Sequence, residues 1–399
     1  MMRYGIWIAL WLLQMGSPAW AQTETFFVQP EDTDTAYSAG TDSHFVAIQR
    51  DDPTRDRLLL YMGGTNSSPS RTTLFLERAA ELGYHAASIS YPNSTSVQSA
   101  CGSSADRDCH MEFRQEACFG TPMSGSIDID SLNSIVTRTV KLLQYLARQF
   151  PGQSWDKYVE DDRLVWSKVV TAGHSQGAGH ALYLAQARSV ARCLMFSGAN
   201  DYSNFYDAPA QWVSDSFATP RHDMFSFLHL RDEGVPDSYD QFAILDALGL
   251  WAVSDSVRVD GATPPYQNAQ ILYTNEQPRI QFLAPFHNAT VVDNWTPINQ
   301  QGQPVFSPVW TYMLTTRTPT AAPPKTKSSE AFSIYPNPAT DHLLVEVAYA
   351  RSMRVYDLRG HVRYHKILAP GKHRIDISSL EPGLYIMRIQ GQEQTFLKK

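Results

Sequence analysis

The stretch KVVTAGHSQGAGHALYLA, residues 168–185, constrains the possible folds more than any other part of this chain. Its apolar start predicts a strand over 168–173, and the small and apolar residues from Gln176 onward predict a helix. Ser175 lies between them in the pattern Gly-x-Ser-x-Gly. Gly173 and Gly177 stand where a sharp strand–turn–helix tolerates only the smallest residues. A serine raised above a sheet edge by such a turn is typical of a nucleophile, so Ser175 is the candidate.

Strand and helix signals alternate on both sides of this motif. Apolar runs predict further strands over 57–62, 84–91, 192–198, 224–230 and 269–275. Helical spacing of apolar residues predicts helices over 72–83, 130–150 and 238–249, the second with Asp130 as its N-cap. This alternation predicts an α/β fold, a mostly parallel sheet with helices on both faces.

Residues 92–127 interrupt this alternation with a polar stretch that contains three of the four cysteines. A stretch of this length without regular structure is typical of a lid, a binding loop or a stapled insertion. Because it follows a predicted strand directly, we expect it on the catalytic side of the sheet. We expect Cys101 and Cys109 to form a local disulfide, and Cys193 to be a buried free thiol on a strand.

The two ends of the chain differ from its body. Arg3, an apolar run over 5–13 and the small-x-small pattern at Ala19 and Ala21 predict a secretory signal peptide over 1–21. The run is shorter than the roughly 20 residues that span a bilayer, and no later segment is long and apolar enough, so we expect no membrane span in the mature chain. Residues 318–331 have the composition of a linker, which divides a body over 22–317 from a tail over 332–399. Short alternating runs with Pro and Gly turns predict an antiparallel β-sandwich for the tail.

Charge and residue spacing exclude several classes of function. The net charge is -7, divided into -12 over 22–331 and +4 over 332–399, so no overall basic field attracts nucleic acid. The cysteines lack CxxC pairs and the chain lacks HExxH, so we predict neither a metal site nor a cofactor.

A serine nucleophile needs a base, an acid that orients the base, and donors for the oxyanion. The chain order serine, acid, histidine favours His287, in a loop after the last predicted strand. His180 lies on the same helix as Ser175, His229 lies within a strand, and His222 comes before the strand that should carry the acid.

The acid is expected in the loop RDEGVPDSYD, which follows the strand over 224–230. Asp232 is nearest to the strand end and is the first candidate. Glu233, Asp237 and Asp201 remain alternatives, although Asp237 could instead cap the next helix.

Two backbone amides are candidates for the oxyanion hole. The amide of Gln176 stands at the start of a helix, where the helix dipole favours negative charge. The second donor is expected from GGTNSSPS, after the strand over 57–62, with Thr65 as the first candidate and Gly64 as the second.

With these residues in place, the body over about 44–316 resembles the α/β-hydrolase superfamily, whose members are mostly esterases, lipases and cutinases. The resemblance rests on GGT, on GHSQG, on Asp232 and on His287. The tail resembles the type A sorting domain of the type IX secretion system of Bacteroidota. It carries YPNPATDHLLVEV, VYDLRGHV and IDISSLEPGLYIMRI in that order, followed by a Lys-rich end. This resemblance implies export to the cell surface or the medium, with the secretion machinery as a partner.

The sequence therefore predicts a secreted serine hydrolase that cleaves carboxylic esters through an acyl-enzyme. An amidase or peptidase with the same triad, and a catalytically silent surface-binding protein, are the alternatives. Because the insertion over 92–127 is polar, we expect soluble or polymer-bound esters with short acyl groups rather than long-chain triglycerides.

Overall fold

The computed structural model describes residues 23–37, 40, 42–49, 55–316, 332–347, 351–368, 371–389 and 392–399. The predicted signal peptide over 1–21 and the predicted linker over 318–331 lie outside the described residues.

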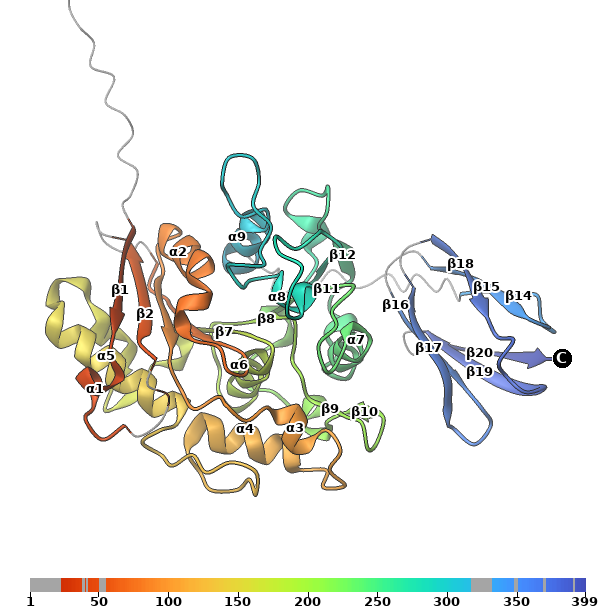
Figure 1. Cartoon of the computed structure of the whole chain (residues 1–399), viewed down its shortest axis with the longest axis horizontal. Helices are drawn as coiled ribbons and strands as arrows, with labels where there is room; N and C mark the ends of the chain where they lie inside the picture. The colour runs from red at the N-terminus through yellow and green to blue at the C-terminus, as the bar shows by residue number, and fades with distance from the viewer. Residues whose placement is uncertain are drawn as a thin grey trace, which may run out of the picture.

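Within these ranges, nine strands of the body form one sheet (Figure 1). Their order across the sheet is β1 (Thr23–Val28), β2 (His44–Gln49), β4 (His85–Ile89), β3 (Leu58–Met62), β7 (Val169–His174), β8 (Arg192–Phe196), β11 (Met224–His229), β13 (Ile271–Thr274) and β12 (Ser256–Arg258). The pairs β1–β2 and β2–β4 are antiparallel, and every pair from β4 to β12 is parallel. The carboxyl ends of the parallel strands therefore meet at one edge of the sheet.

Helices cover both faces of the sheet. The described helices are α1 (Pro30–Thr33), α2 (Thr73–Glu81), α3 (Val97–Cys101), α4 (Cys109–Phe119), α5 (Ile135–Gln149), α6 (Gln176–Ala187), α7 (Ser238–Ala247), α8 (Pro285–Asn288) and α9 (Ser307–Thr315). One core packs α5, α6 and α7 against the sheet, and the other packs α2 and α9. Strands covered on both faces are mainly apolar, in agreement with the uniform burial of β3, β7 and β11.

Two short two-stranded ribbons complete the body. One pairs β5 (Val159–Glu160) with β6 (Arg163–Leu164), and the other pairs β9 (Tyr202–Ser203) with β10 (Ala208–Pro209).

Helix α5 begins later than the sequence predicted. Its N-cap is Ser134, whose Oγ accepts a hydrogen bond from the amide of Thr137, so Asp130 as N-cap was wrong. The Asp130 carboxylate instead accepts from the backbone and side-chain nitrogens of Asn133 and closes the turn before the helix.

The polar stretch over 92–127 contains the helices α3 and α4, so the expected absence of regular structure there was wrong. Cys101 ends α3 and Cys109 begins α4, and the two form a disulfide, as predicted. Cys193 is a buried free thiol on β8, also as predicted, and Cys118 on α4 is a second buried free thiol. The helical signal was missed because α4 carries mixed charges and no clean apolar face.

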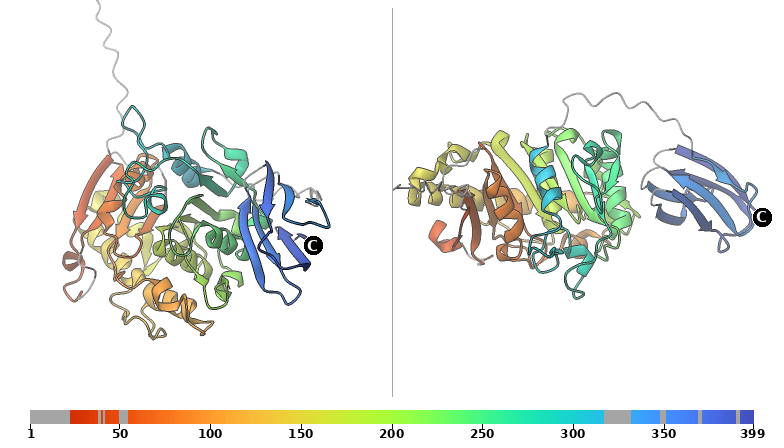
Figure 2. Two further views of the ribbon diagram at one scale, coloured as in Figure 1. Left: turned by 45° about the vertical axis from the view of Figure 1, so that its right-hand side comes forward. Right: turned by 90° about the horizontal axis from the view of Figure 1, so that it is seen from above.

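The tail forms two antiparallel sheets around a core of its own (Figure 2). One sheet has the order β14 (Ile334–Tyr335), β15 (His342–Val347), β18 (Gly371–Asp376), and the other has β17 (Val362–Leu368), β16 (Arg351–Tyr356), β19 (Gly383–Ile389), β20 (Gln392–Lys398). Leu343, Ile375, Met387 and Phe396 are fully buried between the sheets. Residues on β19 alternate between this core and the outer surface, as expected for a sheet with one solvated face.

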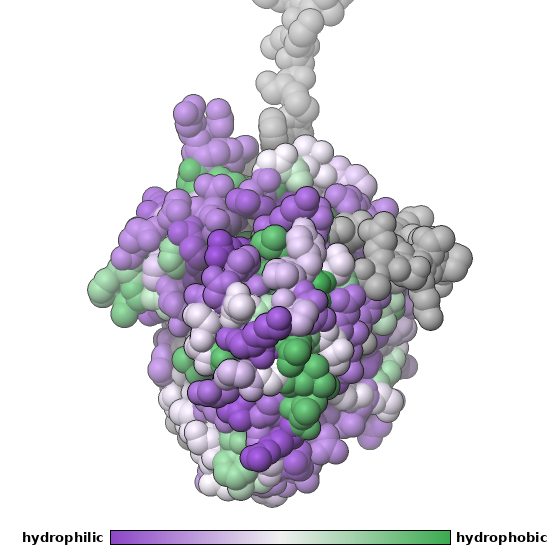
Figure 3. Space-filling view, turned by 90° about the vertical axis from the view of Figure 1, so that its right-hand side faces the viewer, coloured by the Kyte–Doolittle hydropathy of each residue, from purple (hydrophilic) through white to green (hydrophobic). Residues whose placement is uncertain are grey.

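The outer surface of the tail is mainly polar with a small apolar patch (Figure 3). Leu384 on β19 and Leu397 on β20 face each other across the strand pair, and both are more than 40% exposed. Among the helices that the structure describes, none has the length and apolar character needed to cross a membrane.

Candidate active site

Ser175 lies at the turn between β7 and α6, with a φ of 56° and a ψ of -122°. A non-glycine residue in this region of backbone space is strained, and such strain concentrates at functional sites. A Cβ on Gly173 would lie 2.2 Å from the carbonyl oxygen of Gly177, and one on Gly177 would lie 2.1 Å from the carbonyl oxygen of Met62. Both glycines are therefore required by the close approach of the backbone, which is the reason given for them from the sequence.

Asp232 and His287 form a hydrogen-bonded pair near this turn. Asp232 follows β11, and its Oδ1 and Oδ2 lie 2.8 and 3.0 Å from Nδ1 of His287 in α8. The side chain of Asp232 is fully buried, and that of His287 is 12% exposed. Gly234 makes room for the pair, because a Cβ there would lie 2.6 Å from Nδ1 of His287.

Two further donors fix the Asp232 carboxylate. The amide of Gly234 donates to Oδ1 at 2.8 Å, and Nε2 of Gln241 on α7 donates to Oδ2 at 3.0 Å. Burial raises the pKa of Asp232, but the charge of His287 and these hydrogen bonds lower it by more, so the net shift is downward. Gln241 was not singled out from the sequence, because a polar residue on a helix gives no local sign of its distant partner.

Two opposing influences act on the pKa of His287. Burial lowers its pKa, but the charge of Asp232 and the hydrogen bond to it raise the pKa by more, so the net shift is upward. Imidazole Nε2, on the side of the ring opposite to the aspartate, is thereby made a better proton acceptor. This is the electrostatic arrangement that a general base requires.

His287 lies against the residue that precedes Ser175. The rings of His174 and His287 have centroids 4.8 Å apart, and Nε2 of His174 lies 3.0 Å from the carbonyl oxygen of His287. Burial and the neighbouring His287 lower the pKa of His174 to about 3, so His174 stays neutral and donates this hydrogen bond through Nε2. His174 therefore ties the loop of His287 to the turn of Ser175.

The alternative acids in the loop after β11 have other partners. Glu233 accepts hydrogen bonds from the backbone amides of Phe286 and His287, so it holds the backbone of α8 rather than the imidazole. Asp237 accepts from the amide of Asp240 at 3.2 Å and caps α7, which was the other role considered for it.

Asp201, the third alternative, lies away from His287. Its carboxylate binds the guanidinium of Arg114 on α4 through bonds of 3.1 and 2.8 Å, and both side chains are fully buried. Arg114 also donates to the carbonyl oxygen of Gln176, at 2.7 Å. Gly179 is needed here, because its Cβ would lie 2.1 Å from Nη2 of Arg114. No local pattern indicates this pair, because its members are 87 residues apart in the sequence.

The other histidines considered from the sequence are held elsewhere. His180 is buried on α6, with Nδ1 lying 3.3 Å from Nη1 of Arg114. His229 ends β11, and its ring nitrogens are bonded to the carbonyl oxygen of Glu276 and the amide of Arg231. His222 lies 3.4 Å from the carboxylate of Asp223, outside the turn of Ser175.

The two residues that carry the predicted oxyanion donors are joined through their side chains. Gln176 is the first residue of α6, so its amide has no partner within the helix. Oγ1 of Thr65 donates to Oε1 of Gln176 at 3.2 Å, which joins the loop after β3 to the start of α6. A Cβ on Gly64 would lie 3.0 Å from Cβ of Ser175, so the loop after β3 passes directly beside the serine.

Asn200 is a further residue of this site, which the sequence analysis did not single out. It follows β8, and its Nδ2 donates to Oγ of Ser175 at 3.0 Å. Its position just after a predicted strand was the signal available, because that is where the sheet edge should carry functional groups. From the sequence, its neighbour Asp201 was the candidate at this position.

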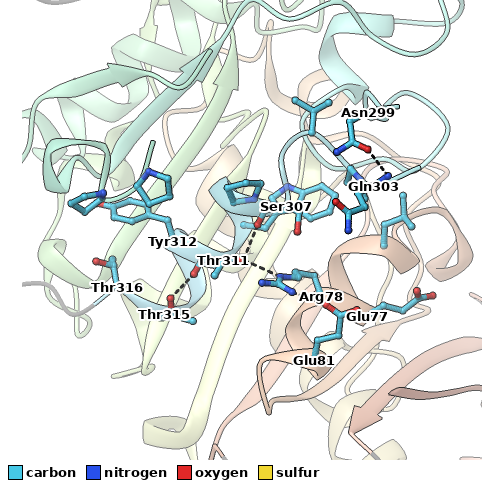
Figure 4. Close-up of a pocket in the computed structure, with 17 residues that line it drawn as sticks. Glu77, Arg78, Glu81, Asn299, Gln303, Ser307, Thr311, Tyr312, Thr315 and Thr316 are labelled. Carbon is cyan, nitrogen blue, oxygen red and sulfur yellow. Dashed lines mark hydrogen bonds and ion pairs between the residues drawn. The ribbon is translucent and has the colours of Figure 1, made fainter. Parts of the chain in front are cut away.

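The well-formed pocket of about 820 Å³ in Figure 4 lies elsewhere on the body. It is lined by α2, by α9 and by the loops around Pro264 and Asn299. Ser175, Asp232 and His287 are absent from its lining. The candidate site is therefore identified from its side chains and not from this cavity.

Comparison with known proteins identifies the tail. Residues 333–399 match the family described as "Secretion system C-terminal sorting domain". The tail is a secretion sorting domain. The chain is accordingly exported by type IX secretion, to the cell surface or the medium, as the sequence predicted.

Two similar proteins cover small parts of the chain. Beta-agarase D of Zobellia galactanivorans is 31% identical over 115 residues, which are 28% of this chain and 23% of that protein. A solved structure of PorZ from Porphyromonas gingivalis, described as an essential bacterial surface component of the type IX secretion system, covers 18% of this chain and 12% of that one. Its identity is 14% and its TM-score 0.16, too low to carry an argument. The chain spans less than a quarter of the length of either protein.

Proposed function

We propose that the body is a serine hydrolase of the α/β-hydrolase type, which cleaves carboxylic esters through an acyl-enzyme. The observation that carries the proposal is the buried Asp232–His287 pair beside the strained turn of Ser175. The order of strands adds support. The serine follows β7, the middle strand of the nine-stranded sheet, the aspartate follows β11, and the histidine follows β13. All three groups thus belong to carboxyl ends of parallel strands, where sites of open α/β sheets form.

In the proposed first step, Oγ of Ser175 forms a bond to the carbonyl carbon of the ester. Its proton passes to Nε2 of His287, and the carbonyl π electrons move to the oxygen, which the amides of Gln176 and Thr65 stabilise. Asp232 holds His287 in the correct tautomer and stabilises the imidazolium. His287 then gives the proton to the leaving alcohol as the carbon–oxygen bond breaks. Water repeats the sequence on the acyl-enzyme and releases the acid.

The insertion over 92–127 supports the expected substrate class. Its loop is bonded to the side chain of Gln176, through the carbonyl oxygen of Thr95 at 3.1 Å and the amide of Val97 at 2.8 Å. Arg114 fastens the same residue from α4. An insertion joined to the turn of the nucleophile is a poor candidate for a lid that swings open on lipid. We therefore propose soluble or polymer-bound esters with short acyl groups, taken up by an exported enzyme.

Two alternative functions each differ from the proposed esterase in one feature, the leaving group or the absence of catalysis. An amidase or peptidase would use the same groups on a nitrogen leaving group, and no residue described here selects against it. A silent surface-binding protein would keep the fold without proton transfer. The short match to an agarase covers too little of either chain to favour a glycosidase.

A series of p-nitrophenyl esters with acyl chains of increasing length tests the proposal, run with and without an oil–water interface. We expect hydrolysis that is fastest for short chains, insensitive to the interface and absent in Ser175→Ala. Highest activity on long chains, with a jump at the interface, would identify a lipase instead. Hydrolysis retained by Ser175→Ala would exclude Ser175 as the nucleophile.

A further inference from the structure

The hydroxyl of Ser175 is bonded to a group other than the proposed base. Oγ accepts a hydrogen bond from Nδ2 of Asn200 at 3.0 Å. Among the described residues, no hydrogen bond joins Oγ to His287. A serine that attacks a carbonyl must give its proton to the base, so Oγ has to come within hydrogen-bond reach of Nε2 of His287. The bond to Asn200 therefore belongs to the resting enzyme.

Asn200 and His287 belong to different segments, since Asn200 follows β8 and His287 lies in α8 after β13. Asn200 is followed by Asp201, which is bound to Arg114 of α4, on the face that α6 covers. His287 precedes Val291 and Val292, which belong to the core on the face of α2 and α9. A rotation of the serine side chain that brings Oγ to Nε2 of His287 therefore starts from the orientation bonded to Asn200.

The Asn200 side chain is held in place by its surroundings. The residue is only 5% exposed, and a Cβ on Gly198 would lie 3.2 Å from its Oδ1 and 2.8 Å from the carbonyl oxygen of Ser175. Its Oδ1 is buried without a hydrogen-bond partner among the described residues. A buried polar atom without a partner is costly, so the bond from Nδ2 to Oγ, and not Oδ1, stabilises this orientation of the side chain. Asn200 is thus a fixed donor aimed at Oγ.

We propose that Asn200 is a positioning residue that holds Ser175 in a resting orientation, from which Oγ must be released before it can attack. The inference rests on the proposed function, because it concerns the nucleophile of that reaction. The amide stabilises the resting serine and contributes nothing once Oγ has turned to His287. Its removal therefore lowers the cost of reaching the reactive orientation, and every reagent that attacks Ser175 should react faster.

Phosphonylation by a fluorophosphonate measures this directly, because the reagent needs only the reactive Oγ and not turnover. We expect the second-order rate constant to rise about three- to tenfold in Asn200→Ala and in Asn200→Leu, the range that one net hydrogen bond supplies. Leucine matches the shape of asparagine and removes the unpaired Oδ1, so the melting temperature of Asn200→Leu should not fall. Asn204→Ala, at an exposed asparagine four residues later, is the matched control and should react like the wild type.

A rate constant that falls tenfold in both variants, at unchanged melting temperature, would show that the amide activates the nucleophile and would overturn the proposal. A change of less than twofold would also overturn it. Crystal structures of the wild type and Asn200→Ala give a second result that needs no hydrolysis. We expect Oγ to turn within hydrogen-bond distance of His287 in the variant, and Oγ in its original position would contradict the proposal. If no form of the protein is labelled at Ser175, the proposed function fails, and the position of Oγ alone decides the role of Asn200.

Discussion

Two buried aspartates lie close to the turn of Ser175, and each is paired with a nitrogen group of a different kind. Asp232 is bonded to the imidazole of His287, and Asp201 is bonded to the guanidinium of Arg114. Histidine gains and loses a proton near neutral pH, whereas arginine stays charged at every pH a protein survives. The first pair can therefore move a proton, and the second can only hold its charge in place. The same type of side chain is thus suited to the proposed chemistry in one pair and to fixed geometry in the other.

The largest effect should come from Asp232→Asn, which keeps the shape of the first pair and removes its charge. His287 would lose both its orienting acceptor and the charge that stabilises its protonated form. We expect kcat on a short-chain ester to fall about ten-thousand-fold, with little change in stability. Steady-state kinetics together with thermal unfolding measure this. Glu233→Gln should keep most of the activity, and a loss as large as that of Asp232→Asn would reassign the acid.

Arg114→Met should have the opposite effect to Asp232→Asn, because it should lower the free energy of unfolding more than it lowers activity. It leaves Asp201 buried without a partner and removes the donor to the carbonyl of Gln176. Breaking a buried pair in this way costs about 3–5 kcal/mol of the free energy of unfolding. Urea unfolding measures the loss, with Arg148→Met on the exposed face of α5 as the control. An Arg114→Met protein as stable as the wild type but inactive would show that Arg114 takes part in the chemistry.

The disulfide of the insertion should contribute less than the Arg114–Asp201 pair. Cys101 and Cys109 close a short loop, and the loss of chain entropy in the unfolded state supplies about 2–3 kcal/mol for such a loop. The double variant Cys101→Ser with Cys109→Ser should therefore unfold at lower urea concentration, with a reduced but measurable rate of ester hydrolysis. If instead its stability equals that of the wild type, the staple has no role in fastening the insertion.

The smallest expected effect is a shift of the pH profile. Asp232 raises the pKa of His287 above its ordinary value, and His287 must be neutral to accept the proton of Ser175. Activity should consequently rise with pH through this raised pKa. In Asp232→Asn the imidazolium is less stable, so its pKa falls and the acidic limb of the remaining activity moves to lower pH. Profiles of kcat/KM from about pH 5 to about pH 9 report the shift. If the acidic limb stays in place or moves to higher pH, the limb does not report the titration of His287.

The sequence was most informative where the signal is local. Gly173 and Gly177 mark the turn of Ser175, because backbone atoms leave no room for a Cβ there. Cys101 and Cys109 are eight residues apart, and their pairing was predicted and is confirmed. The sorting domain was recognised from three short motifs and is confirmed by its family.

Long-range partners were beyond the sequence. Arg114 and Asp201 meet only after folding, and Asp201 was considered solely as an alternative acid. Gln241 and Asn200 are ordinary polar residues until the sheet places them beside Asp232 and Ser175. The assignment of Ser175, Asp232 and His287 to catalysis stays a prediction, although the last two are hydrogen-bonded in the structure.

The most direct test of the account is the identity of the residue that a fluorophosphonate probe modifies. The probe should form one covalent adduct with the folded chain, and peptide mass spectrometry should place it on Ser175. Ser175→Ala should abolish the adduct, and Asp232→Asn should slow its formation strongly. An adduct that survives Ser175→Ala, or a wild-type protein that remains unmodified under conditions that label a known serine esterase, would contradict the account.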